Sequence, residues 1–181
     1  MLELLDVLDE RGNPTGEVLP RDEVHSQGLW HRTVHVWITN ANGQVLLQQR
    51  SFKKADHPGE WDTITGGHLQ TGQTVVQGAM RELHEELGLV VEPEKLELLF
   101  ENTWQSQHLG YANNEFNPTF LLQVDQPISA FTFNDGEVIA LHWVSLDQLE
   151  ELIRKKQVLV RKNIEARVIG ILRERLNDAH A

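Results

Sequence analysis

The spacing of apolar and polar positions changes along this chain, and the changes predict both strands and helices. Short segments that alternate with a period of two, or short apolar runs between Gly, Pro, Asn and Asp turns, predict strands. They lie at residues 2–8, 17–19, 33–39, 44–49, 96–105, 118–124 and 138–144. The tetrapeptide at 40–43, Asn-Ala-Asn-Gly, is typical of a hairpin turn between two of these strands.

Apolar positions with a helical period predict a central helix over residues 73–87. This helix would carry one apolar stripe, made by Val76, Ala79, Met80, Leu83 and Leu87. A shorter helix is expected at 21–27, a capping box at 145–148 opens another, and a terminal helix is expected at 162–176. Strands before and after a central helix, with a helix at the end, predict an α/β protein with a mixed sheet covered on both faces.

Composition narrows the class of protein. The chain has 181 residues, which suits a single domain over 1–181, with 40% hydrophobic and 24% charged residues. Its net charge of −11 argues against a nucleic acid polymer as partner, because contacts along a phosphate backbone need Lys and Arg. A small phosphorylated ligand is still compatible with this net charge, since a metal ion and a few local cations can bind it.

The lack of cysteine and of long apolar segments in the sequence indicates in which cellular compartment the protein is expected. The chain has no cysteine, which excludes disulfides, thiol nucleophiles and zinc–thiolate sites. The first residues are acidic and lack a long apolar run, so no signal peptide is expected. No apolar stretch approaches membrane-spanning length, so no membrane partner is expected. We therefore expect a cytoplasmic protein.

Three carboxylates on the central helix are the strongest sign of chemistry. Glu82, Glu85 and Glu86 are spaced i, i+3 and i+4, which places them on one face of a helix. Like charges side by side repel, so the arrangement is costly unless a cation lies between them. A hard divalent ion such as Mg²⁺ or Mn²⁺ prefers oxygen ligands and typically brings a substrate phosphate with it.

The stretch around these acids resembles the Nudix box, the signature of the Nudix hydrolase superfamily. The family pattern is a Gly, five residues, a Glu, seven residues, then Arg-Glu-aliphatic-any-Glu-Glu-any-Gly-aliphatic. In this chain Gly67 opens the pattern, residues 81–83 follow at the right distance, and residues 85–89 close it. One position departs, because Gln73 stands where the pattern has Glu.

The resemblance covers about residues 6–148 and implies the Nudix fold, an α/β/α sandwich with a mixed β-sheet. It also implies a Mg²⁺- or Mn²⁺-dependent hydrolase that cleaves a diphosphate linkage in a small molecule. By the resemblance, Glu82, Glu85 and Glu86 are metal ligands, and the carbonyl of Gly66 or its neighbour adds an oxygen. Arg81 would hold the acids in register through charge-assisted hydrogen bonds.

Two questions about this implied site stay open. The general base is one of the three glutamates or a carboxylate in a neighbouring loop. Gln73 keeps the size of the usual Glu but not its charge, so we expect weaker metal affinity rather than loss of the site. The opposing interpretation of Gln73 is a non-catalytic, nucleotide-binding Nudix module.

A narrower resemblance lies outside the box. Residues 28–38, 46–51 and 58–62 are similar to the Nudix proteins related to isopentenyl-diphosphate isomerase. In that isomerase, several His residues and a later carboxylate form a metal site. The matching positions here, which we take as a candidate second metal or substrate site, are His25, His31, His68 and Glu115.

Two departures weigh against isomerase activity. The isomerase needs a thiol immediately before the box Gly, where this chain has Gly66, and it has a second carboxylate where this chain has Asn113. Double-bond isomerisation needs a proton donor and an acceptor on opposite faces of the alkene. The sequence therefore predicts a hydrolase on an isomerase-like scaffold, with an isomerase-like enzyme as the alternative.

The residues that would choose the substrate are less defined. Arg50 ends a strand beside the expected cleft and is a candidate diphosphate contact, whereas the lysines that follow it are expected to be solvated. Trp61 is either a stacking surface for a base or ring, or a core residue. We expect loops 51–60 and 105–117 to select the substrate, such as a nucleoside diphosphate or a related derivative. Dimers are frequent among relatives, so a homodimer stays open.

Overall fold

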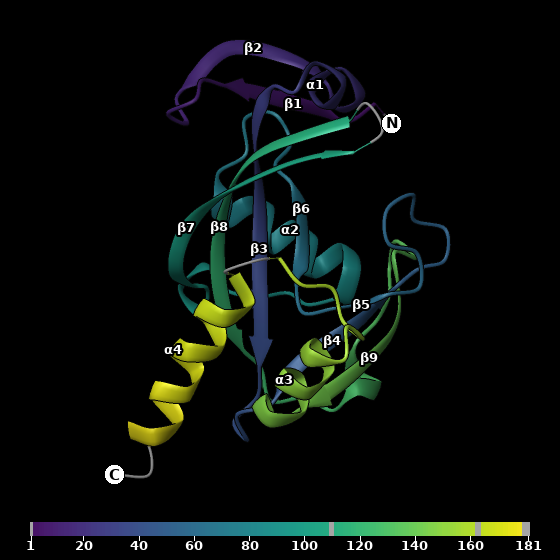
Figure 1. Ribbon diagram of the computed structural model, residues 1–181, viewed down its shortest axis with the longest axis vertical. Coiled ribbons are helices and arrows are strands. Elements are labelled where there is room, and N and C mark those ends of the chain that lie inside the picture. Colours follow the sequence, from purple (N-terminus) through teal and green to yellow (C-terminus); the bar gives the residue numbers. More distant parts are fainter. Residues whose placement is uncertain (1, 109–110, 162–163, 179–181) are drawn as a thin grey trace.

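The computed structural model describes residues 2–108, 111–161 and 164–178. Its sheet is organised around β3 (Trp30–Thr39), which pairs in parallel with β8 (Tyr111–Gln123) and antiparallel with β6 (Thr65–His68). Strand β8 also pairs antiparallel with β7 (Glu97–His108). The β7–β8 ribbon runs past the end of the sheet toward the N-terminal segment (Figure 1).

The N-terminal segment forms a small lobe at that end of β3. Strand β1 (Leu4–Leu8) pairs with β2 (Pro14–Pro20), and α1 (Arg21–Gln27) follows directly. Leu5, Val7 and Val24 make a separate small core between these elements. Helix α1 ends at Gly28, whose positive φ of 64° is the left-handed conformation that Gly adopts at little cost. The lobe thereby places α1 beside the N-terminal end of β3, where the ring centroids of His25 and His31 are 4.8 Å apart.

The remaining strands form a second group that diverges from β3. Strand β4 (Val45–Arg50) pairs with β5 (Trp61–Asp62) and with β9 (Val138–Val144). The ladder between β3 and β4 consists of the single position Thr39↔Val45 next to the hairpin turn. Figure 1 shows the two groups of strands spreading apart from that turn.

Helices cover both faces of the sheet, as alternation along β3 requires. Val34, Val36 and Ile38 face α2 (Val75–Leu87), whereas Trp37 faces the opposite way. On that opposite side lie α3 (Leu146–Arg154) and α4 (Ile164–Asp178). This confirms the expected α/β fold with a mixed sheet covered on both faces.

Helix α2 begins and ends where the sequence contains cap residues. The Thr74 side chain accepts from the backbone N–H of Gln77, and the Gln77 side chain accepts from the N–H of Thr74, which makes a capping box. Gly88 closes the helix with a φ of 68°. A Cβ at Gly88 would lie 1.9 Å from Oγ1 of Thr132, so the close approach of that segment also requires Gly.

Several expected boundaries were wrong. The sequence did not predict β5 and β6, because β5 has only two residues and β6 contains two adjacent glycines, so neither shows an alternating pattern. Residues 105–117, expected to be a loop, are mostly paired strand in the β7–β8 ribbon. The start of the expected helix at 162–176 lies outside the described residues, and α4 is seen from Ile164. Two short 3-10 helices, Pro93–Lys95 and Ile128–Ala130, were also not predicted.

Candidate metal and diphosphate site

The three glutamates of α2 share one face, but their exposure differs. Glu86 is 2% exposed and Glu82 is 8% exposed, whereas the Glu85 side chain is 42% exposed. Glu82 and Glu86 are one turn apart, so their carboxyl groups are buried beside one another. Isolated buried carboxylates are strongly disfavoured unless they are paired or bind a metal.

Burial and the charges of nearby carboxylates raise the pKa values of Glu82 and Glu86. Burial raises the pKa of Glu82 to about 7, against the opposing charge and hydrogen bond of Arg81. Burial, together with the nearby charge of Glu82, raises the pKa of Glu86 well above its ordinary value. The pair therefore resists holding two negative charges in the absence of a cation.

Arg81 holds the acids in place. Its guanidinium donates to Oε2 of Glu85 and to Oε1 of Glu82, both at 2.6 Å. It also donates to the backbone carbonyl of His68 at 2.7 Å, which ties α2 to β6. These contacts agree with the expected positioning role of Arg81.

The two glycines of β6 let this strand approach its neighbours closely. A Cβ on Gly67 would lie 2.5 Å from Oε1 of Glu82, so the carboxylate occupies the space that a side chain would fill. A Cβ on Gly66 would lie 2.0 Å from the carbonyl oxygen of Val34. The backbone of β6 therefore runs beside the carboxylates, where the Gly66 carbonyl was expected to serve as a ligand.

Glu137 joins this cluster from a loop, and sequence reasoning did not identify it. The loop after Ile128–Ala130 is docked on the last turn of α2: the backbone N–H groups of Thr132 and Asn134 donate to the carbonyls of Leu87 and Glu85. This docking satisfies carbonyls that a helix end leaves unpaired. Glu137 lies three residues beyond Asn134, and its carboxylate pairs with Lys54.

Lys54 contributes a second cation to the cluster, on the side of Glu86 and Glu137. Besides its pair with Glu137, its Nζ lies 3.9 Å from Oε1 of Glu86, and its side chain is 22% exposed. The expectation that Lys54 is merely solvated is therefore wrong. Gln48 from β4 also donates to Oε2 of Glu86, at 3.2 Å, and to the carbonyl of Ile64.

The predicted substrate residues Arg50 and Trp61 have structural partners. Arg50 donates through two nitrogens to the carbonyl of Asp56 in the 51–60 loop, and its Nη1 lies 3.9 Å from Oδ2 of Asp62. Trp61 is half-buried against the core on the α3 and α4 side, which fits the core alternative. The Gln73 side chain accepts from the backbone N–H of Gln70 in the turn before α2.

The four residues of the candidate second site converge, although they come from four separate elements. His25 lies on α1, His31 on β3, His68 on β6 and Glu115 on β8. One ligand atom from each lies within 4.8 Å of all the others, and the three ring centroids are 4.8 to 5.2 Å apart. Three imidazoles and a carboxylate at this spacing match the donor set of a transition-metal site.

Hydrogen bonds at the far side of the rings set the tautomers. Nδ1 of His25 lies 2.8 Å from the carbonyl of Arg21, and Nδ1 of His31 lies 3.1 Å from that of Leu29. A carbonyl only accepts, so each Nδ1 carries a hydrogen, and Nε2 is the ring nitrogen left for a ligand. Nδ1 of His68 lies 3.3 Å from Oε1 of Glu3. Such outer partners typically orient histidines that bind metal.

The protonation of this cluster is opposite to that of the α2 acids. Burial lowers the pKa of His25 to about 4, helped by the neighbouring imidazoles. Burial alone would raise the pKa of Glu115, but the hydrogen bond and charge of His31 lower it to about 2. His35, four residues after His31 and on the same face of β3, is also buried, and burial lowers its pKa to about 4.

The acid cluster and the imidazole cluster lie on opposite faces of β6. Alternate residues of a strand face opposite ways, so Gly67 faces Glu82 while His68 faces His25 and His31. The hydrogen bond from Arg81 to the His68 carbonyl crosses between them.

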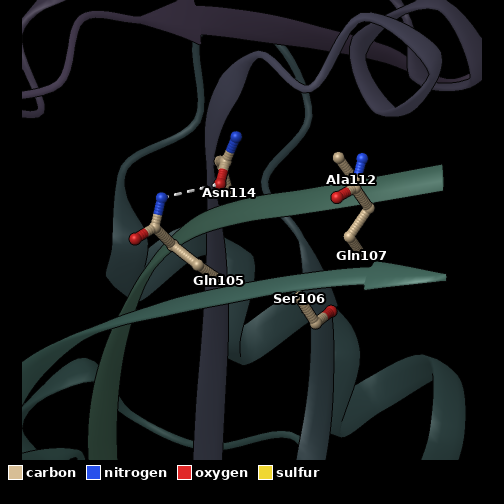
Figure 2. Close-up of a pocket in the computed structure, with 5 residues that line it drawn as sticks. All are labelled: Gln105, Ser106, Gln107, Ala112 and Asn114. Atoms are coloured by element: carbon tan, nitrogen blue, oxygen red, sulfur yellow. Dashed lines mark hydrogen bonds between the residues drawn. The ribbon is translucent and has the colours of Figure 1, made fainter.

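A hollow on the β7–β8 ribbon is distinct from both clusters. It is lined by Gln105, Ser106, Gln107, Ala112 and Asn114 (Figure 2). Gln105 donates to the Asn114 carbonyl oxygen at 3.0 Å, and Asn114 donates to the carbonyl of Gly28 at 2.6 Å. These five described lining residues are polar or small, and none of them is an acid or a base.

A family model for the NUDIX domain matches residues 29–165, which includes α2 and both glycines of β6. The chain belongs to the Nudix family. Nudix hydrolase 3 of Arabidopsis thaliana is 38% identical over 159 residues, which cover 85% of this chain and 21% of that protein. This chain thus spans about a fifth of the length of the Arabidopsis protein.

An isopentenyl-diphosphate Delta-isomerase of Cutibacterium acnes is 28% identical over 159 residues, covering 85% of this Nudix chain and 79% of that enzyme. This similarity supports the isomerase-related branch. The crystal structure of DR0079 from Deinococcus radiodurans matches with a TM-score of 0.66 and 22% identity, over 95% of this chain and 98% of that one. The NUDIX domain of Shewanella oneidensis NrtR, solved with ADP ribose, matches with a TM-score of 0.59 and 19% identity, over 80% and 87%. These structures confirm the Nudix fold.

Among the described residues, no helix combines the length and the apolar character needed to cross a membrane.

Proposed function

We propose that this Nudix protein is a divalent-metal-dependent hydrolase that cleaves a diphosphate linkage in a small molecule, such as a nucleoside diphosphate or a related derivative. The observation that carries the proposal is the burial of Glu82 and Glu86 side by side, which raises the pKa of both. Such a pair destabilises the protein when ionised, and a bound cation removes that cost.

The donor set fits a hard cation. Glu82, Glu85, Glu86 and the Gly66 carbonyl offer oxygen atoms only, which is the ligand type that Mg²⁺ and Mn²⁺ prefer. Glu137 offers a further carboxylate from the docked loop. When bound, the ion would neutralise diphosphate charge and lower the pKa of a water.

The protein's own residues would orient the reactants. Arg81 fixes the rotamers of Glu82 and Glu85, and Gln48 fixes Glu86 by donating to it. Lys54 lies where it can turn from Glu137 toward an anionic substrate, and it is a better candidate for that contact than Arg50, which is bonded to the 51–60 loop. The general base stays open among the three α2 glutamates and Glu137.

We further propose that His25, His31, His68 and Glu115 hold a second ion. The lone pairs of the three Nε2 atoms and the Glu115 carboxylate suit Mn²⁺ or a similar transition metal better than Mg²⁺. This site is the observation that favours the isomerase-like alternative, since the related isomerase has a metal site at these positions.

Against that alternative stands the backbone at Gly66. A thiol-bearing side chain there would have its Cβ 2.0 Å from the Val34 carbonyl oxygen, so the strand would have to move to accept it. The group needed for half of the isomerisation is therefore absent, and its place is closed.

A phosphorus NMR screen tests the proposal. The protein would be incubated with a panel of diphosphate compounds, including ADP-ribose and isopentenyl diphosphate, with and without Mg²⁺ or Mn²⁺. We expect metal-dependent cleavage of a diphosphate linkage in at least one nucleoside derivative. Ligand-dependent thermal stabilisation without any product would instead support a binding module, and conversion of isopentenyl diphosphate to its isomer would support the alternative enzyme. Cytoplasmic location and a homodimer stay predictions.

A further inference from the structure

The side chain of Lys54 lies between two carboxylates that come from distant parts of the chain. Its Nζ pairs with Oε2 of Glu137 in the docked loop, and it lies 3.9 Å from Oε1 of Glu86 on α2. Glu86 is 2% exposed, so little water reaches its carboxylate. The ammonium of Lys54 therefore serves as a counter-ion for both carboxylates, and the chain itself supplies it.

Backbone hydrogen bonds hold the two loops together at this point. The N–H of Ser51 donates to the carbonyl of Glu137 at 2.7 Å, and the N–H of Lys54 donates to the carbonyl of Ser51 at 3.1 Å. The N–H of Glu137 donates to Oδ1 of Asp135 at 2.8 Å. None of these bonds involves the Lys54 ammonium, so the ammonium can move while the backbone of both loops stays in place.

The other cation of the acid cluster, Arg81, is held more firmly. Its guanidinium donates hydrogen bonds of 2.6 to 2.7 Å to two α2 glutamates and to a β6 carbonyl. Nζ of Lys54 is too far from Glu86 for a hydrogen bond, and the Lys54 side chain is 22% exposed, which gives the ammonium a route to solvent. A lysine also carries its charge on a flexible chain, whereas a guanidinium is planar and rigid. Lys54 is thus the cation of this cluster that is free to leave.

A divalent ion at the acid cluster would compete with this ammonium. Mg²⁺ binds carboxylate oxygens directly, so an ion on Glu86 and Glu137 would use the carboxylates that now face Lys54. The ion and the ammonium are both positive, and like charges at adjoining positions repel one another. Movement of the ammonium away from the two carboxylates removes that repulsion.

We propose that Lys54 is an exchangeable counter-ion of the acid cluster. It neutralises Glu86 and Glu137 until a divalent ion binds, the ion displaces the ammonium, and the displaced ammonium then binds the diphosphate. This inference rests on the proposed function and adds an order of binding to it, with the ion first and the diphosphate second.

Acetylation by acetic anhydride, quantified for each lysine by mass spectrometry, follows the ammonium in the wild-type protein. Carboxylates that hold the Lys54 ammonium protect it from reaction, and Lys53, whose side chain is exposed, is the internal reference. We expect Mg²⁺ to raise the rate at Lys54 relative to Lys53 about fivefold, the lower end of a typical coupling between two ligands. Methylenediphosphonate, a diphosphate analogue that resists hydrolysis, should lower the rate at Lys54 again in excess Mg²⁺.

Lys54→Met tests the same exchange through the affinity for the ion, with Lys53→Met as the matched control for one charge lost from this loop. Without the competing ammonium, Mg²⁺ should bind about tenfold more tightly, measured as stabilisation against denaturant at increasing Mg²⁺. Calorimetry in saturating Mg²⁺ should show that Lys54→Met binds methylenediphosphonate about tenfold more weakly. Lys53→Met should change each affinity by less than about twofold, because an exposed charge is screened by salt.

An unchanged acetylation ratio at a Mg²⁺ concentration that stabilises the protein would overturn the inference and leave the proposed function standing. Equal or weaker Mg²⁺ binding by Lys54→Met, or an equal gain in Lys53→Met, would overturn it in the same way. Release of Lys54 by Mg²⁺ and its renewed protection by methylenediphosphonate, without cleavage of any diphosphate in the phosphorus NMR screen, would support the inference and remove the proposed function. If Mg²⁺ does not stabilise the protein at any concentration, both are wrong.

Discussion

The two clusters on either side of β6 are both buried, yet they balance charge in opposite ways. On the α2 side, Glu82 and Glu86 repel one another, and burial raises their pKa values. On the other side, the imidazoles of His25, His31 and His68 surround the single carboxylate of Glu115, whose pKa is lowered to about 2. The acid cluster resists full ionisation without a bound cation, whereas the second cluster places a single carboxylate among three imidazoles. We therefore expect turnover to depend on the first cluster and the affinity for a second ion to depend on the other.

The largest expected effect is that of Glu86→Gln. Removing one ionised ligand should lower kcat by about 10³-fold, the size typical of losing one strong electrostatic contact in an active site. The fold should persist and gain stability, because the buried charge disappears while the acceptor for Gln48 remains. Steady-state kinetics and thermal denaturation measure the two effects. The same change at the exposed Glu174 of α4 is the control, and undiminished kcat in Glu86→Gln would refute the assignment.

His31→Asn tests whether the clusters act separately. We expect affinity for the second ion to fall by about 100-fold, since one of four ligands is lost, while Mg²⁺-dependent kcat changes by less than about tenfold. Metal content after dialysis against Mn²⁺, measured by mass spectrometry, gives the first quantity, and steady-state assays give the second. If kcat falls as far as in Glu86→Gln, the two clusters work as one centre.

The pH dependence of stability should have opposite signs at Glu82 and at His35. The pKa of Glu82 is about 7 in the fold and near 4.5 unfolded, so its stabilising contribution is present below pH 4.5 and is lost as the pH rises through 7. In metal-free protein this loss is on the order of 3 kcal/mol, and Mg²⁺ should restore it. The pKa of His35 is about 4 against 6.5, so its contribution is lost as the pH falls from 6.5 to 4.

Denaturant unfolding from pH 4 to 8 measures these slopes. Wild type compared with Glu82→Gln isolates the first contribution, and wild type compared with His35→Gln isolates the second. Parallel curves for wild type and Glu82→Gln would show that the carboxyl group titrates normally, which would weaken the case for a cation site on α2.

The smallest effect is expected from Gln73→Glu, which restores the usual residue of the box. In this structure Gln73 serves the turn before α2, where its side chain accepts from the N–H of Gln70. Arg81 is already engaged by Glu82, Glu85 and the His68 carbonyl. We expect Mg²⁺ affinity, measured by calorimetry, to rise less than about threefold, within the range of a screened charge near a site. A rise of a hundredfold would mean that the Gln73 departure decides metal binding after all.

Some elements of the structure could be predicted from the sequence because the residues that specify them are close together along the chain. Helix α2 is specified by its apolar stripe, by the capping box at Thr74 and by Gly88, all within a few residues. The strands with apolar alternation were placed to within a few residues. Within the β7–β8 ribbon, residues 105–117 were taken for a loop because the described residues of this stretch are mostly polar and lack apolar alternation. Strand β6 was missed because glycine carries no pattern, although its close approach to Glu82 and Val34 is what makes glycine necessary there.

The sequence by itself determined the fold class, the acid face of α2 and the place of Arg81 beside these acids, because residues three and four apart on a helix meet whatever surrounds them. It also identified the histidines, but only through resemblance, since their ring contacts join four elements that are distant along the chain. Only the tertiary structure decided that Lys54 and Glu137 lie beside Glu86, and that Arg50 is bound to its own loop. These contacts depend on which strands pair and on which loop docks on a helix end. Long-range packing and chain entropy determine both, and no local pattern of residues encodes them.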